Sequence, residues 1–417
     1  MPDKKNILFI SYDGMTDPLG QSQVIPYLVG LTSYGYRFTI LSCEKNAKFN
    51  SNKKYVEEIL RPYPIKWVAI SYHKNPPVFS SLYDVMRLRQ EARRLHREEK
   101  FDMVHTRAGV PALIGLWMKK KMGVKFLHDI REFYADSRID GGMWNTRNFV
   151  FKKIYHFFKR KEEEEIRYCD AIVCLTYAAE KIIRGLDEYK KNIPLEVIPC
   201  SVDLTLFDPG KISDEVKNKL RNDFKIHKND FIVSYLGSLG GWYLTDEMLQ
   251  CCKEIANTIP AARFLFITPH EEAEVFEAAA KFGIDLNKIM VTHAKRHEVP
   301  MYLSLSNYSI FFIKPCYSKK SSSPTKHAEI MAMGIPVITN KGVGDVADIV
   351  ARYNSGIVLE SLDVQDLKTA AIKISEEISS KKAAINSAEI RKGATEYYDL
   401  DKAVKKYKKI YDKVLLT

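Results

Sequence analysis

Short apolar stretches of strand type alternate with segments of helical pattern along this chain, and the alternation occurs twice. The first series of expected strands lies at residues 5–11, 37–42, 103–105, 125–128, 171–175 and 196–199. The second series lies at residues 231–236, 263–268, 288–292, 309–313, 336–339 and 355–359. Alternating strands and helices form parallel βα units, because a crossover helix returns the chain to the same edge of the sheet. The sequence therefore predicts an α/β fold with two doubly wound sheets.

Residues 201–210 separate the two series and end in the turn sequence Asp-Pro-Gly, which favours a connection between domains. We therefore expect a first Rossmann-like domain over residues 1–205 and a second over residues 206–395. The last part of the chain, residues 396–417, contains apolar side chains at helical spacing among six lysines. This pattern predicts an amphipathic terminal helix.

The composition is that of a globular protein and argues against several classes. Apolar residues make up 46% of the 417 positions, and no apolar run approaches the roughly 20 residues that span a bilayer. The seven cysteines are an odd number without a C-x-x-C pair, which argues against a disulfide framework and a structural zinc site. We expect residues 5–11 to form a strand rather than a signal segment, and the chain to work in a reducing cytoplasm.

Positive charge is unevenly distributed. Lysine and arginine outnumber aspartate and glutamate by 64 to 52, and residues 1–200 contain 34 basic against 24 acidic residues. Residues 145–161 hold six basic residues, no acidic residue and five aromatic ones. This segment predicts either an amphipathic helix resting on an anionic membrane or a core helix with solvated lysines. The same charge favours a nucleic-acid-binding module as a rival interpretation.

The segment at residues 308–339 carries the strongest local signal, with the order strand, polar loop, short helix, turn and strand. Ser323 is expected to be the helix N-cap, Pro324 the first helical residue and Gly334 the left-handed stop. These signals predict a helix over about residues 324–333.

The N-terminus of this helix predicts an anion site. Its backbone N–H groups and positive dipole end can bind a diphosphate without a glycine-rich loop. Four lysines flank it: Lys314, Lys319, Lys320 and Lys326. Thr325 and Glu329 share one helix face, so that the first can touch a phosphate while the second accepts bonds from a ribose diol. Neither G-x-G-x-x-G after the first strand nor G-x-x-x-x-G-K-[ST] occurs, which argues against dinucleotide oxidoreductases and P-loop proteins. The alternative is a capped surface helix in a basic loop.

Residues 323–338, SPTKHAEIMAMGIPVI, resemble the nucleotide-sugar signature of GT-B retaining glycosyltransferases, in particular glycosyltransferase family 4. Weaker similarities follow in the family's order at residues 19–22, 167–176, 197–207 and 235–239. The resemblance implies two Rossmann-like domains facing across a cleft. The first would bind the acceptor and the second the donor, and the terminal helix at 396–417 would pack back on the first domain.

The resemblance also implies site residues. Glu329 would bind the donor ribose, and the backbone of Ser323, Pro324 and Thr325 would meet the diphosphate. The loop at Gly20 and the loop at Gly237 and Ser238 would complete the donor site. A histidine after the corresponding strand contacts the transferred sugar in the family, which implies His128, with Asp129 and Arg131 as neighbours in the cleft. His105, at the end of the preceding strand, is the alternative.

Two departures from the family pattern affect the expected charges. Ser321 stands where the family has the first of two glutamates, and residues 237–243 lack the family's arginine and lysine. Another cation must then neutralise the diphosphate. Lys326 is the preferred candidate, and Lys314, Lys320, Lys295 and Arg296 are the alternatives.

The expected reaction is a retaining sugar transfer from a nucleoside-diphosphate sugar to a saccharide or lipid-linked hydroxyl. The departing phosphate would take the acceptor proton, and neither a metal nor a cofactor is expected. The expected setting is cell-surface polysaccharide or lipid-linked glycan synthesis, at the inner membrane face. A nucleotide-sugar epimerase, a degenerate donor-binding protein and the nucleic-acid-binding module remain rivals, although no nucleic-acid partner is expected.

Overall fold

The computed structural model describes residues 5–76, 79–380 and 386–416. The chain folds into two compact units. Unit 1 consists of Met1–Pro199, Lys320–Ser322 and Leu400–Thr417, and unit 2 consists of Cys200–Lys319 and Ser323–Asp399. The chain therefore passes between the units near residues 199 and 399, where the sequence led us to expect boundaries at 205 and 395, and also on either side of Lys320–Ser322.

Unit 1 contains a seven-stranded parallel sheet in the order β3-β2-β1-β4-β5-β6-β7. Its strands are β1 (Lys5–Ser11), β2 (Tyr36–Glu44), β3 (Ile65–Ser71), β4 (Met103–Arg107), β5 (Lys125–Ile130), β6 (Ala171–Cys174) and β7 (Leu195–Val197). The six strands expected from the sequence are confirmed. β3 was missed, although residues 67–70 form an apolar run; it is an edge strand, and most of its residues are only half-buried.

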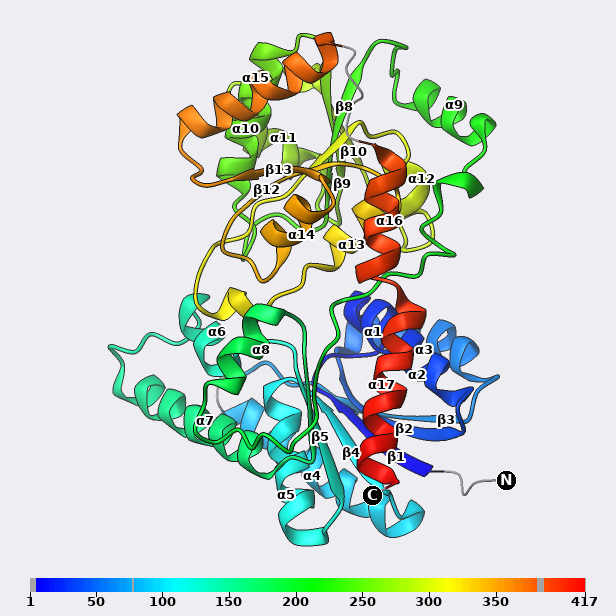
Figure 1. Ribbon diagram of the computed structural model, residues 1–417, viewed down its shortest axis with the longest axis vertical. Helices are drawn as coiled ribbons and strands as arrows, with labels where there is room; N and C mark the ends of the chain where they lie inside the picture. Colours follow the sequence, from blue (N-terminus) through cyan, green and yellow to red (C-terminus); the bar gives the residue numbers. More distant parts are fainter. Residues whose placement is uncertain (1–4, 77–78, 381–385, 417) are drawn as a thin grey trace. The chain divides into compact units, whose positions relative to one another are not determined.

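The helices of unit 1 are α1 (Pro18–Gln23), α2 (Ile25–Thr32), α3 (Asn46–Leu60), α4 (Phe79–Glu99), α5 (Gly109–Met122), α6 (Tyr134–Asp140), α7 (Phe149–Tyr168), α8 (Tyr177–Arg184) and the terminal α17 (Leu400–Leu415). Two apolar cores fill the two faces of the sheet. One includes side chains of α4, α5 and α7, and the other includes side chains of α2 and α17. Figure 1 shows α17 beside α2. The terminal helix thus packs on the first unit, as the resemblance implied.

Close packing between α2 and α17 depends on a missing side chain. A Cβ atom on Gly30 would lie 2.7 Å from Cγ2 of Val404. The buried residues of α17 are Ala403, Val404, Tyr407, Ile410, Tyr411 and Val414. This is the apolar stripe that the spacing predicted, and its burial explains why a lysine-rich helix belongs to the core of unit 1.

Unit 2 contains a six-stranded parallel sheet in the order β10-β9-β8-β11-β12-β13. Its strands are β8 (Phe231–Leu236), β9 (Ala262–Ile267), β10 (Ile289–Thr292), β11 (Tyr308–Ile310), β12 (Val337–Asn340) and β13 (Gly356–Leu359). Its helices are η1 (Pro209–Lys211), α9 (Asp214–Asp223), α10 (Thr245–Thr258), α11 (Glu272–Ala280), η2 (Leu286–Lys288), α12 (Val299–Leu303), α13 (Thr325–Ala332), α14 (Val346–Arg352), α15 (Val364–Ser380) and α16 (Ser387–Tyr397). A further 3-10 turn, η3 (Ser318–Ser321), lies where the chain passes into the segment grouped with unit 1. All six strands of the second series are confirmed.

Candidate functional site

Helix α13 follows a polar loop at the carboxyl end of the sheet of unit 2, and its start differs from the prediction. The helix begins at Thr325, and Pro324 is its N-cap with extended backbone. The hydroxyl of Ser323 does not cap the helix, because it accepts the backbone N–H of Cys200 at 3.2 Å. No side chain in the described part of the protein caps α13, so the first N–H groups of the helix remain open to an anion. The predicted left-handed stop is confirmed, with φ +71° at Gly334.

Lys326, in the first turn of α13, points at an aromatic wall formed by Tyr235 of β8 and Tyr243 of the following loop. Its Nζ lies 3.6 Å from the ring centroid of Tyr243 and 4.6 Å from that of Tyr235. The side chain is buried, and Nζ has no hydrogen-bond partner among the described residues. Burial lowers the pKa of Lys326 to about 7, although the charge of Glu329 opposes the shift.

Gly237, in the loop after β8, has φ +117°, a conformation that favours glycine. A Cβ atom there would lie 2.9 Å from Nζ of Lys326. Lys326 therefore reaches the loop in which the family pattern has its two cations. The next residue, Ser238, is exposed, and its carbonyl accepts a hydrogen bond from the hydroxyl of Tyr235.

Glu329 lies one turn deeper in α13 and is paired with an arginine from the loop after β10. Nη1 of Arg296 donates to Oε1 of Glu329 at 2.8 Å, and the guanidinium lies 5.5 Å from the ring centroid of Phe207. Burial raises the pKa of Glu329, while Arg296 opposes this shift. The ion pair therefore holds the carboxylate in a defined position and favours its charged form.

The other flanking lysines have different surroundings. Lys314 is exposed on the loop after β11. The Nζ atom of Lys319 lies 3.6 Å from the ring centroid of Trp242. Lys320 and Ser321 are grouped with unit 1: the carbonyl of Lys320 accepts the hydroxyl of Thr176 at 2.7 Å, and the hydroxyl of Ser321 accepts the backbone N–H of Phe133 at 3.2 Å. Ser321 is thus a buried structural residue at the position where the family has a carboxylate.

In unit 1, His128 and Asp129 are neighbours on β5 and point to opposite faces of the sheet. His128 faces α7, where its Nε2 lies 3.7 Å from Oε2 of Glu165. Burial lowers the pKa of His128 to about 4, despite the charge of Asp129, and burial raises the pKa of Glu165. His128 is therefore a neutral, buried group at pH 7, and its predicted contact with the transferred sugar remains a prediction.

Asp129 lies on the face that α17 covers. Its Oδ2 accepts the hydroxyl of Tyr407 at 2.9 Å and lies 3.3 Å from Nε2 of His105 and 3.3 Å from Nε of Arg131. Burial alone would raise the pKa of Asp129, but Arg131, His105 and Arg107 lower it to about 2. The other ring nitrogen of His105 lies 2.7 Å from the hydroxyl of Tyr411. The three predicted acceptor residues, His105, Asp129 and Arg131, therefore form one charged cluster under the terminal helix.

Gly20 lies in α1, where the loop after β1 turns back on itself. A Cβ atom there would lie 2.3 Å from the carbonyl oxygen of Gly14. The buried carboxylate of Glu44, at the end of β2, fixes this loop by accepting the N–H of Met15 at 2.6 Å and both the N–H and the hydroxyl of Thr16. Sequence reasoning missed Glu44, because its partners at Met15 and Thr16 lie some 28 residues away along the chain.

Arg107 was also missed. It is the last residue of β4, it is buried, and its Nη1 lies 2.6 Å from Oδ2 of Asp13. Ala108 follows with φ +63°, a backbone conformation that non-glycine residues rarely adopt and that clusters at functional sites. Its position as a basic residue at the end of an expected strand could have identified Arg107 from the sequence.

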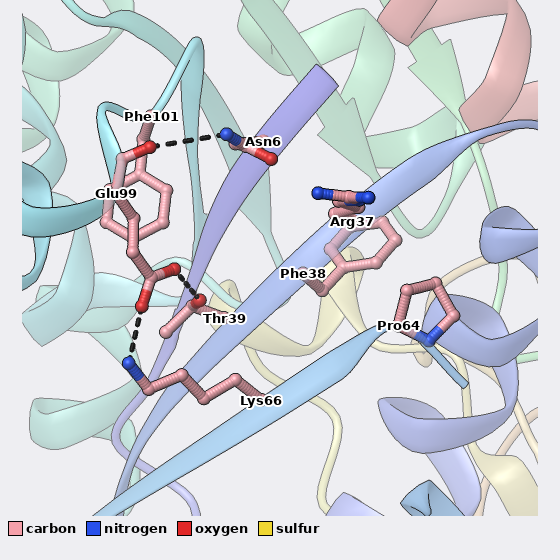
Figure 2. Close-up of a pocket in the computed structure, with 8 residues that line it drawn as sticks. All are labelled: Asn6, Arg37, Phe38, Thr39, Pro64, Lys66, Glu99 and Phe101. Carbon is pink, nitrogen blue, oxygen red and sulfur yellow. Dashed lines mark hydrogen bonds and ion pairs between the residues drawn. The ribbon is translucent and has the colours of Figure 1, made fainter. Parts of the chain in front are cut away.

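One pocket of unit 1 lies away from these residues, at the amino ends of β1, β2 and β3. It has a volume of about 430 Å³. Figure 2 shows Glu99 bound to Thr39 and Lys66 inside it. Parallel sheets of this kind bind ligands at the carboxyl ends of their strands, so this pocket is not the candidate site.

No group of three or more His, Cys, Asp or Glu side chains in residues 5–76, 79–380 and 386–416 could hold a metal ion. No helix in the same part of the chain is long and apolar enough to cross a membrane.

Known proteins support both the fold and the family. Residues 27–206 match the family described as Glycosyltransferase Family 4, and residues 216–391 match Glycosyl transferases group 1. The chain is 22% identical over 362 residues to the UDP-Gal:alpha-D-GlcNAc-diphosphoundecaprenol alpha-1,3-galactosyltransferase of Escherichia coli, covering 86% of this chain and 85% of that protein.

Solved structures share the architecture along nearly the whole chain. A glycosyltransferase from Rickettsia africae has a TM-score of 0.72 at 16% identity, with 99% of each chain covered. Alr3699/HepE from Anabaena, solved in complex with UDP-glucose, has a TM-score of 0.71 at 13% identity and covers 97% of this chain and 98% of its own. The chain is therefore a glycosyltransferase of family 4 with the GT-B fold.

Proposed function

We propose that the protein binds a nucleoside-diphosphate sugar at the N-terminus of α13 and transfers the sugar to a hydroxyl acceptor with retention of configuration. The main support for this donor site is the position of Lys326. Its Nζ atom is buried between Tyr243 and the Gly237 loop and has no hydrogen-bond partner among the described residues. An unpaired buried ammonium group is costly unless an anion binds it. The uncapped helix and the ammonium group together suit a diphosphate.

Glu329 is proposed to accept the ribose hydroxyls, with Arg296 keeping the carboxylate charged. The relatives suggest uridine as the base, since the names of the E. coli and Anabaena proteins include UDP-Gal and UDP-glucose. Lys314, Lys320 and Ser238 are proposed to make further contacts with the donor, and Ser238 directly follows Gly237 in the loop that Lys326 reaches.

In the proposed reaction, the bond between C1 of the sugar and the diphosphate oxygen breaks, and a bond from C1 to the acceptor oxygen forms on the same face. The acceptor proton passes to the departing phosphate, so no protein nucleophile is needed. Lys326 and the helix dipole would stabilise the charge that develops on the leaving group. We propose on this ground that transfer needs neither a divalent metal nor a further cofactor.

The acceptor is proposed to be a lipid-linked saccharide, as the name of the E. coli relative suggests. It would bind to unit 1 at the strand ends near His128 and Arg131. The protein would then act in lipid-linked glycan synthesis as a peripheral protein of the inner membrane face, with no nucleic-acid partner.

The test is transfer of a labelled sugar from UDP-glucose or UDP-galactose to a polyprenyl-diphosphate saccharide in the presence of EDTA. Extraction into butanol measures the product, and NMR of the purified product gives the anomeric configuration. We expect a retained configuration, loss of transfer in Glu329→Gln and unchanged transfer in Glu277→Gln, a matched exposed glutamate of the same unit. An inverted product would contradict retention, and dependence on a metal would contradict the role of Lys326.

A further inference from the structure

The first turns of α4 and α7 present large apolar side chains to solvent. Phe79, the first residue of α4, is 72% exposed, and Phe149, the first residue of α7, is 67% exposed. They are the most exposed aromatic side chains of residues 5–76, 79–380 and 386–416. Single exposed apolar side chains are common on protein surfaces, but a contiguous exposed apolar patch marks an interaction site.

On α4 the exposed apolar residues form a stripe. Phe79, Leu82, Tyr83 and Met86 are 72%, 56%, 43% and 55% exposed and follow the i, i+3, i+4, i+7 spacing of one helix face. The buried face of the same helix is formed by other residues: Ser80, Asp84, Leu88, Ala92 and Leu95. The stripe is therefore a second apolar face that the fold of unit 1 leaves uncovered.

Both helices start at the same edge of the sheet. α5 packs against α4 and against α7, and Figure 1 shows the three helices together. α4 follows the carboxyl end of β3, and α7 ends before the amino end of β6. Since both helices run against the strand direction, Phe79 and Phe149 lie at the edge where the strands of unit 1 end, which is the edge of the predicted acceptor residues.

Positive charge accompanies the apolar side chains. Arg147, Lys152, Lys153 and Arg160 are exposed along α7 and its approach, and no ion pair joins any of them to a carboxylate of the described chain. Lys153 lies 4.4 Å from the ring centroid of Phe149. On α4, Arg93 and Arg97 are exposed beyond the apolar stripe. An aromatic side chain beside unpaired cations suits the headgroup layer of an anionic bilayer.

We propose that α4 and α7 form a membrane-docking surface, with Phe79, Leu82, Met86 and Phe149 entering the headgroup boundary of an anionic bilayer and the cations of α7 binding its phosphates. The proposal deepens the proposed function, since it would bring the strand ends of unit 1 to a lipid-linked acceptor. Lys159 is not part of the surface, because it lies 3.0 Å from both Asp136 and Glu162. Under this proposal both interpretations of residues 145–161 apply to part of the segment: the half-buried Phe158 packs on Tyr134 and Trp144, whereas Phe149 and Phe157 are exposed.

The test is flotation of the full chain with vesicles of phosphatidylglycerol and phosphatidylcholine, and with phosphatidylcholine vesicles alone. We expect binding to the anionic vesicles that weakens with salt. The triple variant Phe79→Ser, Leu82→Ser, Met86→Ser should bind at least about tenfold more weakly, and Lys152→Gln with Lys153→Gln should weaken binding severalfold. The matched control is Val364→Ser, Ile372→Ser, Ile378→Ser, which removes three exposed apolar side chains from α15 of unit 2 and should bind as the unaltered protein does.

Several outcomes would overturn the docking surface. These are equal binding to neutral and anionic vesicles, no binding to either, or full binding by the α4 variant. Light scattering that shows a dimer broken by the α4 substitutions would assign the stripe to a second copy of the chain instead. UDP binding by the α4 variant separates this proposal from the donor site: we expect it to be unchanged, so loss of vesicle binding and loss of donor binding are distinguishable.

Discussion

The ammonium nitrogen of Lys326 lies 3.6 Å from the ring centroid of Tyr243 and reaches the loop at Gly237 from a helix almost ninety positions further along the chain. The loop itself contains no cation. The charge that the family pattern has in this loop therefore comes to the same place from α13. The aromatic wall keeps the ammonium group away from water, where its interaction with a diphosphate is strongest.

Replacing Lys326 with methionine should remove most of the donor affinity. The change keeps the apolar stem and deletes the charge, and we expect UDP to bind at least about thirtyfold more weakly, as for other charge-assisted phosphate contacts. Lys314→Met, which removes an exposed lysine, should change the affinity less than about threefold. Isothermal titration calorimetry measures both, and equal losses would contradict the assignment of Lys326.

Donor binding should take up a proton above neutral pH. Because the pKa of Lys326 is about 7 in the free protein, the amine is mostly neutral at pH 8 and must be protonated to pair with the diphosphate. UDP affinity should be nearly constant below pH 7 and fall above it. Titrations at pH 8 in buffers of different ionisation enthalpy should report an uptake of nearly one proton, which Lys326→Met abolishes. The absence of uptake in the unaltered protein would show that Lys326 is already charged or is not at the diphosphate.

The lowered pKa of Lys326 also predicts that the contribution of this residue to stability increases with pH. The folded state binds the Lys326 proton less tightly than the unfolded state, so this residue's contribution to the free energy of unfolding rises with pH from about 7 to the unfolded lysine value near 10.4. Lys326→Met should therefore raise Tm at pH 6 while it weakens UDP binding. A lower Tm at that pH would mean that the ammonium group has partners and stabilises the fold.

Removing Arg296 should move the acid limb of activity. Burial already raises the pKa of Glu329 and Arg296 opposes this, so Arg296→Ala should raise that pKa further. Protonation of Glu329 would then weaken ribose binding at a higher pH. In Arg296→Ala the acid limb of the kcat/KM profile should lie at a higher pH than in the unaltered protein. In Arg296→Lys it should return part of the way. An unshifted acid limb would show that Arg296 does not act through Glu329.

His128 can be tested separately from the nucleotide. If it contacts the transferred sugar, His128→Ala should lower kcat by about tenfold or more while UDP, which lacks the sugar, binds unchanged. His156→Ala, at an exposed position on α7, is the control. A purely structural His128 would instead lower Tm and affect both measurements together.

The terminal helix should stabilise unit 1 through its tyrosines. Tyr407→Phe removes the hydrogen bond to Asp129 and leaves a buried carboxylate with one partner fewer, which should cost about 1–3 kcal/mol of the free energy of unfolding. Tyr55→Phe, at a residue that is 51% exposed, should change it by less than about 0.5 kcal/mol. Urea denaturation measures both, and equal effects would show that the Tyr407 hydroxyl has no net role.

The sequence predicted most of the fold because central parallel strands are continuous apolar runs, as in Ile7–Ile10 and Phe264–Ile267. It missed β3, where Lys66 and Ser71 are exposed on an edge strand. It placed the stop of α13 at Gly334 correctly, because that stop depends on local backbone conformation. It placed the start wrongly, because the hydroxyl of Ser323 is taken by Cys200, a partner more than a hundred positions away.

The candidate site was predictable in part. Glu329 and Lys326 share the first turns of one helix, so their proximity followed from helical spacing. The pairing of Glu329 with Arg296, and the aromatic wall around Lys326, depend on how separate loops fold together, which periodicity does not encode. Side chains alternate between the two faces of a strand, so the sequence already implied that His128 and Asp129 point to opposite faces. Only the packing of α7 and α17 showed which groups each of them contacts.

The most direct test of the donor site is a crystal structure with UDP bound. We expect the diphosphate on the backbone N–H groups at Thr325 and Lys326, with the Lys326 ammonium group bound to it and the ribose hydroxyls on Glu329. A diphosphate bound elsewhere, for example in the pocket at the amino ends of β1, β2 and β3, with α13 empty, would contradict the proposed donor site.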